Sequence, residues 1–446
     1  MRTAVIAVGT EILMGQIVNT NAVYISQELN ALGHDVMYHY TVGDNPQRLS
    51  EIIEFAFKDC DLIITTGGLG PTQDDLTKET ACEVLHDKLV LHEPSLEHVK
   101  KVFGDMHREM TDNNIKQAYL PSRAVILDNP GGTAPGFALE YEGKHIICLP
   151  GPPREMKSMF TEKALPYLKS RSESAIFYRL IRTYGIGESD LETELLDLID
   201  VQTDPTIATY AKEGESYVRV ASKRNSEEEA KQAVEEMIGR IRERIGKYIY
   251  STNGEDLPVV AGNKLIENNI TLSCAESCTG GLFADTLIDI PGISAVFDRG
   301  LVTYSNRAKM DELGISAATL GKYGAVSRET AIEMAEGLQK KTGSDICISV
   351  TGIAGPDGGT EEKPVGLVYI CAVRKKKAGD ACCEKDAGYQ ARADVMDLNS
   401  SSFSNEITES GDQRIVKRMQ MRNIGRKWNR SRAMLAMMDV VNKMIQ

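Results

Sequence analysis

Histidine is missing from most of this 446-residue sequence, because all seven histidines lie at or before residue 145. Catalysis beyond that point can therefore use neither a Ser-His-Asp triad nor histidine-ligated zinc. The nine cysteines are scattered and form no CxxC pair. This spacing favours free thiols in a reducing compartment over a disulfide framework or a structural metal site.

Long apolar runs and an excess of positive charge are missing as well. No segment approaches the roughly 20 apolar residues of a membrane span, and residues 1–9 are too short for the core of a signal peptide. Acidic residues outnumber basic ones by 64 to 51, which gives a net charge of -13. Such a balance argues against direct binding to nucleic acid or to an anionic membrane. We expect a cytoplasmic protein.

The order of apolar runs, glycines and helical segments predicts an α/β protein of three domains. Residues 1–168 alternate strand and helix, as in a parallel sheet covered by helices. Residues 169–252 have the pattern of a small α+β module. A linker rich in turn-forming residues precedes a second α/β domain at residues 257–446. Within it, residues 375–420 show no periodicity, and we expect a mobile or inserted segment there.

Four loops with glycine or acidic residues follow predicted strands or turns of the first domain, at residues 9–11, 43–45, 67–77 and 129–136. Loops at the carboxyl edge of a parallel sheet commonly bind ligands, and glycine-flanked amides suit phosphate. One such loop is explained by turns and helix caps alone, whereas four converging loops favour a site. The candidate ligand-binding residues are Gly67, Gly68, Gly70, Thr72, Asn129, Gly132 and Thr133, and the candidate ligands of a divalent metal are Glu11, Asp44, Asp74 and Asp75.

The last domain carries hydroxyl-rich motifs at predicted strand ends, in residues 275–281, 291–294, 303–309 and 351–359. A serine is a poor nucleophile without a base. Because this domain has no histidine, the base must be a lysine, a carboxylate or a metal hydroxide. Lys309 is a candidate if burial lowers its pKa, although an isolated lysine on a helix is more often a surface ammonium.

The first domain resembles the molybdopterin-binding family and the amino-terminal half of the CinA (competence/damage-inducible) family. The residues that carry this resemblance are Thr65 to Thr77 and Leu149 to Met156. It implies a three-layer αβα domain that hydrolyses ADP-ribose to AMP and ribose 5-phosphate with Co²⁺, Mn²⁺ or Mg²⁺. Residues 183–189 and 209–212 are similar to the middle part of full-length CinA proteins.

The last domain resembles the CinA carboxy-terminal domain, a nicotinamide-mononucleotide (NMN) deamidase, over residues 258–374 and 423–445. The resemblance implies a homodimer that hydrolyses NMN to nicotinate mononucleotide and ammonia without a cofactor. The family's phosphate-binding arginine corresponds to Arg426 or Arg414, and the residues that follow favour Arg426. The remaining active-site positions map onto catalytic Ser277, Ser294, Tyr304, Lys309 and Thr351, with Gly280, Gly281 and Gly352 contacting substrate.

In the leading hypothesis, Ser294 attacks the carboxamide, Lys309 accepts its proton, and Tyr304 or Ser277 relays a proton to the leaving ammonia. Amides near Thr351 would stabilise the oxyanion. The sequence alone leaves the choice of serine open, with Cys278 as a rival nucleophile. Two other hypotheses are a non-catalytic molybdopterin-like ligand-binding scaffold and a protein partner in DNA uptake or the damage response.

Overall fold

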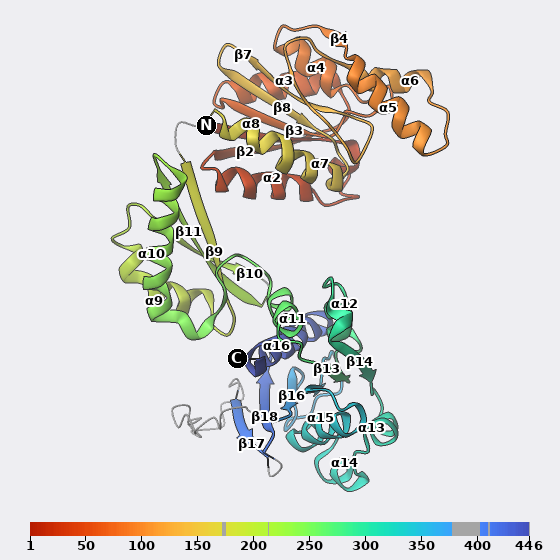
Figure 1. Ribbon diagram of the computed structural model, residues 1–446, viewed down its shortest axis with the longest axis vertical. Coiled ribbons are helices and arrows are strands. Elements are labelled where there is room, and N and C mark those ends of the chain that lie inside the picture. The colour runs from red at the N-terminus through yellow and green to blue at the C-terminus, as the bar shows by residue number, and fades with distance from the viewer. Residues whose placement is uncertain (172–174, 213, 377–401, 409–410, 446) are drawn as a thin grey trace. The chain divides into compact units, whose positions relative to one another are not determined.

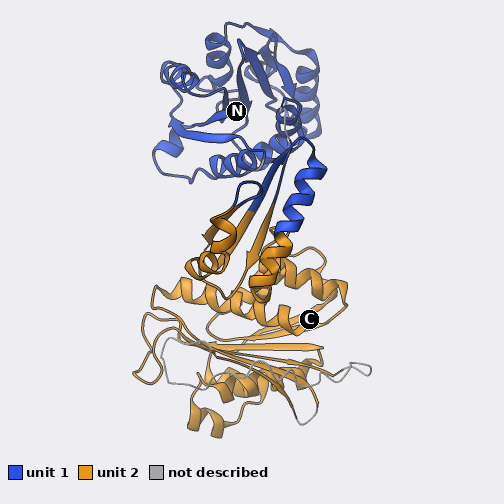
Figure 2. Cartoon of the chain, turned by 90° about the vertical axis from the view of Figure 1, so that its left-hand side faces the viewer, with its two compact units in different colours: residues 1–178, 202–206, 220–237 blue, residues 179–201, 207–219, 238–446 orange. Residues whose placement is uncertain are grey.

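The computed structural model of the protein describes residues 1–171, 175–212, 214–376, 402–408 and 411–445 (Figure 1). Spatial contacts divide the chain into two compact units (Figure 2). Unit 1 contains residues 1–178, 202–206 and 220–237, and unit 2 contains the remainder. The predicted middle module is therefore shared between the units, and the domain boundaries proposed from sequence stay predictions.

The first domain is built on a six-stranded sheet in the order β2-β1-β3-β8-β7-β6. The first four of these strands run parallel, and β7 and β6 are antiparallel to their neighbours. The sequence suggested that the segment around Ile126 continues the parallel pattern. In the structure it is an edge strand that pairs antiparallel with β7. The strands are β1 (Arg2–Val8), β2 (Asp35–Val42), β3 (Leu62–Thr66), β6 (Val125–Leu127), β7 (Gly136–Tyr141) and β8 (Lys144–Leu149).

Helices cover both faces of this sheet, which confirms the three-layer αβα prediction (Figure 1). Side chains alternate along each strand, so that Ile6 packs with α3 and α4 while Val5 packs with α2 and α7. Asn45 caps α3 by accepting a 2.9 Å hydrogen bond from the amide of Arg48. The helices are α1 (Thr10–Leu13), α2 (Thr20–Ala31), α3 (Pro46–Phe57), α4 (Thr77–Val84), α7 (Pro153–Met159), a π-turn (Phe160–Ala164) and α8 (Leu165–Lys169).

An additional segment lies between α4 and β6, and we call residues 89–121 the β4–β5 excursion. Its two strands form an antiparallel pair of their own. Val99 and Leu120 are buried, and Leu120 belongs to the core of the main sheet, so the excursion packs onto the first domain. It consists of β4 (Leu89–Leu91), α5 (Glu93–Asp105), α6 (Asp112–Ile115), a 3₁₀ turn (Lys116–Ala118) and β5 (Tyr119–Pro121).

The middle module is a four-stranded sheet in the order β10-β11-β9-β12, with two helices. This confirms the α+β prediction, and β10 and β12 are additional strands that the sequence reading missed. Ser226 caps α10 through a 3.3 Å bond from the amide of Glu229, as its Ser-x-x-Glu pattern predicted. The elements are β9 (Ala175–Thr183), α9 (Glu188–Ile199), β10 (Thr206–Lys212), β11 (Glu215–Arg224), α10 (Glu227–Ile245), a 3₁₀ turn (Gly246–Tyr248) and β12 (Ile249–Ser251).

The last domain has a six-stranded sheet in the order β14-β13-β15-β16-β18-β17. The strands β14, β13 and β15 run parallel, and β16, β18 and β17 are antiparallel. The strands are β13 (Leu272–Glu276), β14 (Phe297–Val302), β15 (Ile346–Gly352), β16 (Leu367–Arg374), β17 (Ser402–Ile407) and β18 (Gln413–Gln420).

Strands β17 and β18 contradict the expectation of a mobile or inserted segment over residues 375–420. Arg414 on β18 contacts Glu406 on β17 at 2.7 Å and Glu336 at 2.9 Å, which ties both strands to the domain. The sequence reading missed β18 because basic side chains interrupt its apolar alternation. Residues 377–401 of the expected segment lie outside the described residues.

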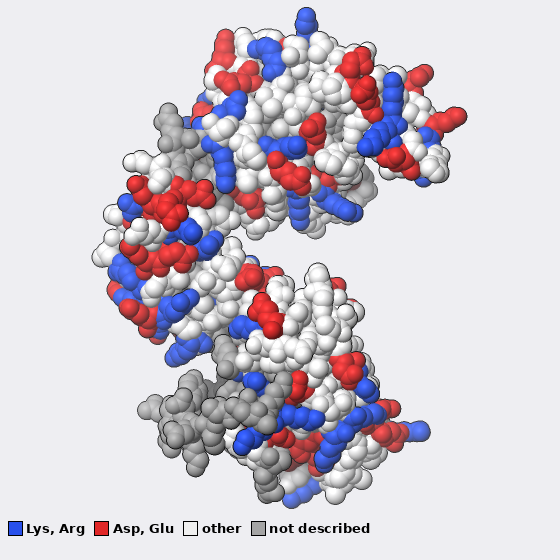
Figure 3. Space-filling model, in the orientation of Figure 1, with Lys and Arg blue, Asp and Glu red and all other residues white. Residues whose placement is uncertain are grey.

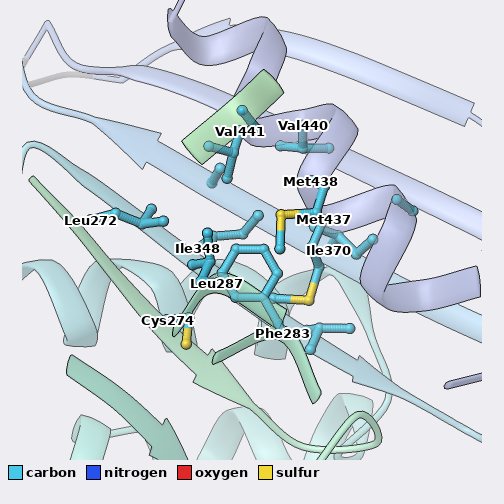
Figure 4. Packing of buried hydrophobic residues seen from close by; sticks show 14 of the residues in the cluster. Leu272, Cys274, Phe283, Leu287, Ile348, Ile370, Met437, Met438, Val440 and Val441 are labelled. Carbon is cyan, nitrogen blue, oxygen red and sulfur yellow. The ribbon is translucent and has the colours of Figure 1, made fainter. Parts of the chain in front are cut away.

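Helices also cover both faces of the last sheet. One face carries α11, α12 and α16, and Phe283, Leu287 and Met437 pack there against Ile348 and Ile370 (Figure 4). Met334 and Leu338 of α15 cover the other face. The helices are α11 (Leu257–Glu267), α12 (Leu282–Ile288), a 3₁₀ turn (Ile293–Ala295), α13 (Asn306–Leu313), α14 (Ala317–Tyr323), α15 (Arg328–Thr342) and α16 (Arg426–Ile445).

The surface carries both signs of charge. On the face drawn in Figure 3, Lys and Arg are interspersed with Asp and Glu. Among the described residues, none of the helices combines the length and the apolar character that crossing a membrane requires.

Candidate functional site

Three of the four motifs of the last domain, residues 275–281, 303–309 and 351–359, meet at one edge of its sheet. Because β14, β13 and β15 are parallel, the loops that follow them lie at their shared carboxyl edge. The Ser277 amide donates to the carbonyl of Val350 at 3.1 Å, which holds the loop after β13 against β15. The start of α16 reaches the same loops, since Arg430 donates to the carbonyl of Thr279.

Lys309 and Ser277 form the central contact of this edge. The Nζ atom of Lys309 lies 2.9 Å from Ser277 Oγ, 2.7 Å from the carbonyl of Thr303 and 3.4 Å from that of Tyr304. The Lys309 side chain is 1% exposed. Burial lowers its pKa from the usual lysine value to about 8. An uncharged amine can donate to the two carbonyls and direct its lone pair at the Ser277 hydroxyl.

Glu276 holds the loop after β13 in place. Its carboxylate is 1% exposed and accepts hydrogen bonds from the amides of Gly281 (3.0 Å), Phe283 (3.1 Å) and Ala284 (3.0 Å). A carboxylate at a helix start satisfies amides that have no partner within the helix. The loop that presents Ser277 is therefore anchored at both ends, although the sequence reading did not single out Glu276.

We expect Glu276→Gln to lower the free energy of unfolding by about 2–3 kcal/mol, because the amide NH₂ cannot accept all three hydrogen bonds. Urea denaturation measures this difference. Glu267→Gln is the matched control, since Glu267 is exposed at the end of α11. Equal stability of the two variants would contradict the anchoring role.

Tyr304 and Arg426 lie together on the exposed side of this carboxyl edge. One Arg426 nitrogen donates to the Tyr304 hydroxyl at 2.8 Å, and another donates to the carbonyl of Gly355 at 2.8 Å. The Tyr304 side chain is 60% exposed. Arg414 is engaged instead by Glu336 and Glu406, and it pairs with Val373 at the opposite end of β16 from the site. The structure thus favours Arg426 as the candidate anion-binding arginine.

The remaining predicted site residues at this edge, Thr351, Gly352, Gly280 and Gly281, determine the path of the backbone. The Thr351 hydroxyl donates to the carbonyl of Ala325 at 2.7 Å, so it is occupied within the fold. A Cβ on Gly352 would lie 2.6 Å from Val368 Cγ2. Gly280 and Gly281 have φ angles of 61° and 95°, which favour glycine and produce the turn into α12.

Ser294 does not lie with Lys309. Ser294 is in the exposed 3₁₀ turn that precedes β14, whereas Ser277 follows β13. Leu272 pairs with Phe297, and Glu276 pairs with Val302. This parallel register places the two serines at opposite ends of strands about 17 Å long. The structure therefore separates the residue expected to be the nucleophile from its expected base.

Cys278 is close to the same centre but is not prepared to act as a nucleophile. Its side chain is 6% exposed. Burial raises the pKa of the Cys278 thiol to about 12. The thiolate is the reactive form, so this thiol remains protonated at neutral pH.

The loops of the first domain meet at the carboxyl edge of their own sheet, as predicted. Strands β1, β2, β3 and β8 end there, and β7 begins there. Thr10 donates to Asp44 Oδ2 from its amide (3.0 Å) and its hydroxyl (2.8 Å), which joins the first two loops. A Cβ on Gly67 would lie 2.1 Å from the Val8 carbonyl oxygen, so only glycine fits this close approach.

The third loop is closed by its own side chains. Both the amide and the hydroxyl of Thr72 donate to Asp75 Oδ2. A Cβ on Gly70 would lie 2.4 Å from the same oxygen, and one on Gly68 would lie 2.1 Å from Thr77 Oγ1. The glycines therefore allow a tight loop.

The fourth loop is held from two sides. Asn129 donates to the carbonyl of Ala134 at 2.9 Å and to Glu155 Oε2 at 2.7 Å. A Cβ on Gly132 would lie 2.1 Å from the same Glu155 oxygen. Thr133 accepts a 3.1 Å bond from Gln117.

The four predicted metal ligands are not assembled into one site. Asp44 and Asp75 already accept bonds from Thr10 and Thr72, whereas Asp74 and Glu11 are exposed. Over the described part of the chain, no group of three or more His, Cys, Asp and Glu side chains is arranged to hold a metal. The donor set thus does not form a ready site for a divalent cation.

Several residues of both sites were not singled out from the sequence. Glu276 could have been recognised as an acid beside a glycine turn that starts a helix. Asn429, 1% exposed, donates to the carbonyl of Ala354 at 2.9 Å from α16. Lys116 and His98 contact first-domain loops from the β4–β5 excursion, and no local pattern indicates these long-range contacts.

Three family models match the chain in succession. They are a probable molybdopterin binding domain at residues 4–170, a damage-inducible protein CinA KH domain at residues 178–251 and a CinA C-terminal domain at residues 255–402.

Whole-length relatives are similar over most of the chain. One relative, from Acetivibrio thermocellus, is named a putative competence-damage inducible protein. It is 55% identical over 370 residues, which are 83% of this chain and 90% of the relative. A CinA-like protein from Dictyoglomus turgidum is 50% identical with the same coverage. The crystal structure of CinA from Thermoplasma acidophilum, of unknown function, covers 37% of this chain and 97% of its own at 36% identity and a TM-score of 0.35. The sequence identity and coverage of the relatives show that this chain belongs to the CinA family.

Proposed function

We propose that the last domain is a serine–lysine amidohydrolase that converts NMN and water to nicotinate mononucleotide and ammonia. The observation that carries the proposal is the buried 2.9 Å contact between Lys309 Nζ and Ser277 Oγ. A lysine whose pKa lies near 8 can act as a base close to neutral pH. In this proposal Ser277, in place of Ser294, is the nucleophile, and its contact with Lys309 supports that choice.

In the first half of the reaction, Ser277 Oγ attacks the carboxamide carbon while Lys309 takes its proton. The resulting tetrahedral oxyanion requires backbone amides, and in this proposal the amides of Cys278 to Gly280, which follow Ser277 in the chain, donate to it. Lys309 then gives its proton to the leaving nitrogen. The C–N bond breaks, ammonia departs, and the nicotinate mononucleotide acyl group remains on Ser277 as an ester.

In the second half, Lys309 takes a proton from water, which attacks the ester carbon. The ester C–O bond breaks and the proton returns to Ser277, so nicotinate mononucleotide leaves and the dyad is restored. No histidine or cofactor participates in either half of the proposed reaction.

Two exposed residues bind the rest of the substrate in this proposal. Arg426 would hold the 5′-phosphate, because a guanidinium forms paired hydrogen bonds with phosphate oxygens. The Tyr304 hydroxyl accepts from Arg426, so its own proton stays available to a substrate oxygen. Phosphate binding would thus be linked to the orientation of Tyr304.

The test is ammonia release from NMN by the purified full chain, with its folding checked by circular dichroism. Production of ammonia together with nicotinate mononucleotide supports the proposal. A folded sample that releases no ammonia would overturn it and would favour the scaffold hypothesis.

We propose ADP-ribose as the ligand of the first domain, with hydrolysis to AMP and ribose 5-phosphate as its reaction. The observation that favours this second function is the gathering of glycine-bearing loops at one sheet edge. The test is AMP release with and without Co²⁺, Mn²⁺ or Mg²⁺. Binding of ADP-ribose without AMP release under any of these conditions would overturn hydrolysis and leave a ligand-binding domain.

A further inference from the structure

The β4–β5 excursion contacts two loops of the first domain that are far apart in the sequence. Lys116 binds the loop at residues 72–75, whereas His98 and Gln117 bind the loop at residues 129–133. Both loops lie at the ligand-binding edge described above. The excursion therefore holds two separate parts of the candidate nucleotide site.

Lys116 acts on its loop as a bound cation would. Its Nζ atom lies 3.0 Å from the Thr72 carbonyl oxygen, 2.5 Å from that of Asp75 and 3.6 Å from a carboxylate oxygen of Glu79. The ammonium donates hydrogen bonds to the two carbonyl oxygens, and Glu79 adds an ion pair at longer range. Lys116 thus links the backbone of Thr72 and Asp75, the two residues that also bond to each other within the loop.

His98 holds the other loop through one ring nitrogen. Its Nε2 atom lies 3.0 Å from the carbonyl oxygens of both Asn129 and Gly132. Since both partners are acceptors, this nitrogen carries the proton and donates to both. Gln117, the neighbour of Lys116 in the chain, donates to Thr133 at 3.1 Å.

The residues that make these contacts belong to one packed body. Val99 and Ala118 are fully buried, and they flank His98 and Gln117 in the sequence. The buried Lys78 of α4 donates to the Lys116 carbonyl at 2.5 Å, which fixes the 3₁₀ turn to the domain. A displacement of the excursion would therefore move both loops together.

We propose that the β4–β5 excursion is a clamp that sets the spacing of the two loops around a nucleotide diphosphate, with Lys116 and His98 as positioning residues. The proposal rests on the nucleotide-binding function proposed for the first domain. Two linked phosphates require anion-binding loops at a defined separation, and the clamp supplies that separation from outside the sheet.

The experiment combines amide hydrogen exchange with ADP-ribose titration of the full chain. The variants are Lys116→Met, His98→Ala and the double variant, with Lys100→Met as the control because Lys100 is exposed on α5. We expect faster exchange in loop 72–75 for Lys116→Met, in loop 129–133 for His98→Ala, and no change in β1 or β3. His98→Gln, which keeps an N–H donor, should restore slow exchange.

Each single variant should weaken ADP-ribose binding about tenfold, as expected for the loss of such hydrogen bonds. The double variant should be no weaker than either single variant, because releasing one loop already destroys the spacing. Unchanged loop exchange, or losses of affinity that simply add, would overturn the clamp. A wild-type chain that does not bind ADP-ribose would instead overturn the proposed ligand, while the exchange data would still decide whether the excursion holds the loops.

Discussion

Replacing Ser277 by alanine is expected to lower kcat/KM for NMN deamidation by about four orders of magnitude, which corresponds to about 5 kcal/mol of transition-state stabilisation. The reason is the 2.9 Å contact with Lys309, through which the Ser277 hydroxyl alone reaches the base in the proposed reaction. Ammonia release under saturating and subsaturating NMN measures the change. Mass spectrometry of the wild-type chain during turnover should detect the nicotinate mononucleotide acyl ester on the peptide that contains Ser277.

Ser294→Ala is the matched control for this prediction, because it removes the same hydroxyl from the opposite end of β14. We expect its activity to stay within about threefold of wild type, since an exposed substitution of this kind is close to neutral. Cys278→Ala tests the remaining rival. An inactive Ser294→Ala beside an active Ser277→Ala would show that the nucleophile has been assigned to the wrong serine.

The pH dependence of the deamidase should follow the titration of Lys309. Burial lowers the Lys309 pKa to about 8, so about one molecule in ten carries the free amine at pH 7. Because only the free amine can accept a proton, kcat/KM should fall about tenfold for each pH unit below 8 and reach a plateau above it. Initial rates between pH 6 and pH 9.5 measure the profile.

Lys309→Arg distinguishes a base from a simple positive charge. Arginine keeps the charge but does not release its proton in this pH range, so this variant should be inactive throughout. Lys340→Met is the control, since Lys340 is exposed on α15, and its profile should match that of wild type. A flat wild-type profile, or an active Lys309→Arg variant, would rule out Lys309 as the base.

The sequence was sufficient for features that depend on neighbouring residues. Strand ends, glycine turns and helix caps are determined by the hydrogen-bonding choices of a few consecutive residues. Thus Ser226 caps α10 as its Ser-x-x-Glu pattern indicates. Because no histidine follows residue 145, a lysine was one of the candidate bases in the last domain. The buried Lys309 is suited to that role.

Tertiary structure decided which distant residues meet. Ser277 and Ser294 belong to similar hydroxyl motifs. Only the parallel register of β13 with β14 places them at opposite ends of these strands. Asp44 and Asp75 look like metal ligands in sequence, yet Thr10 and Thr72 each donate to one oxygen, Oδ2, of these carboxylates.

The sequence pattern did not predict strands β17 and β18. These strands are stabilised by the pairing of β18 with β16 and with β17, and by the ion pairs of Arg414. The sequence by itself determined the local elements, the family motifs and the inventory of reactive groups. The fold alone decided which serine faces the lysine and which acids are already bound, because strand register and burial depend on contacts between residues that are distant in the chain.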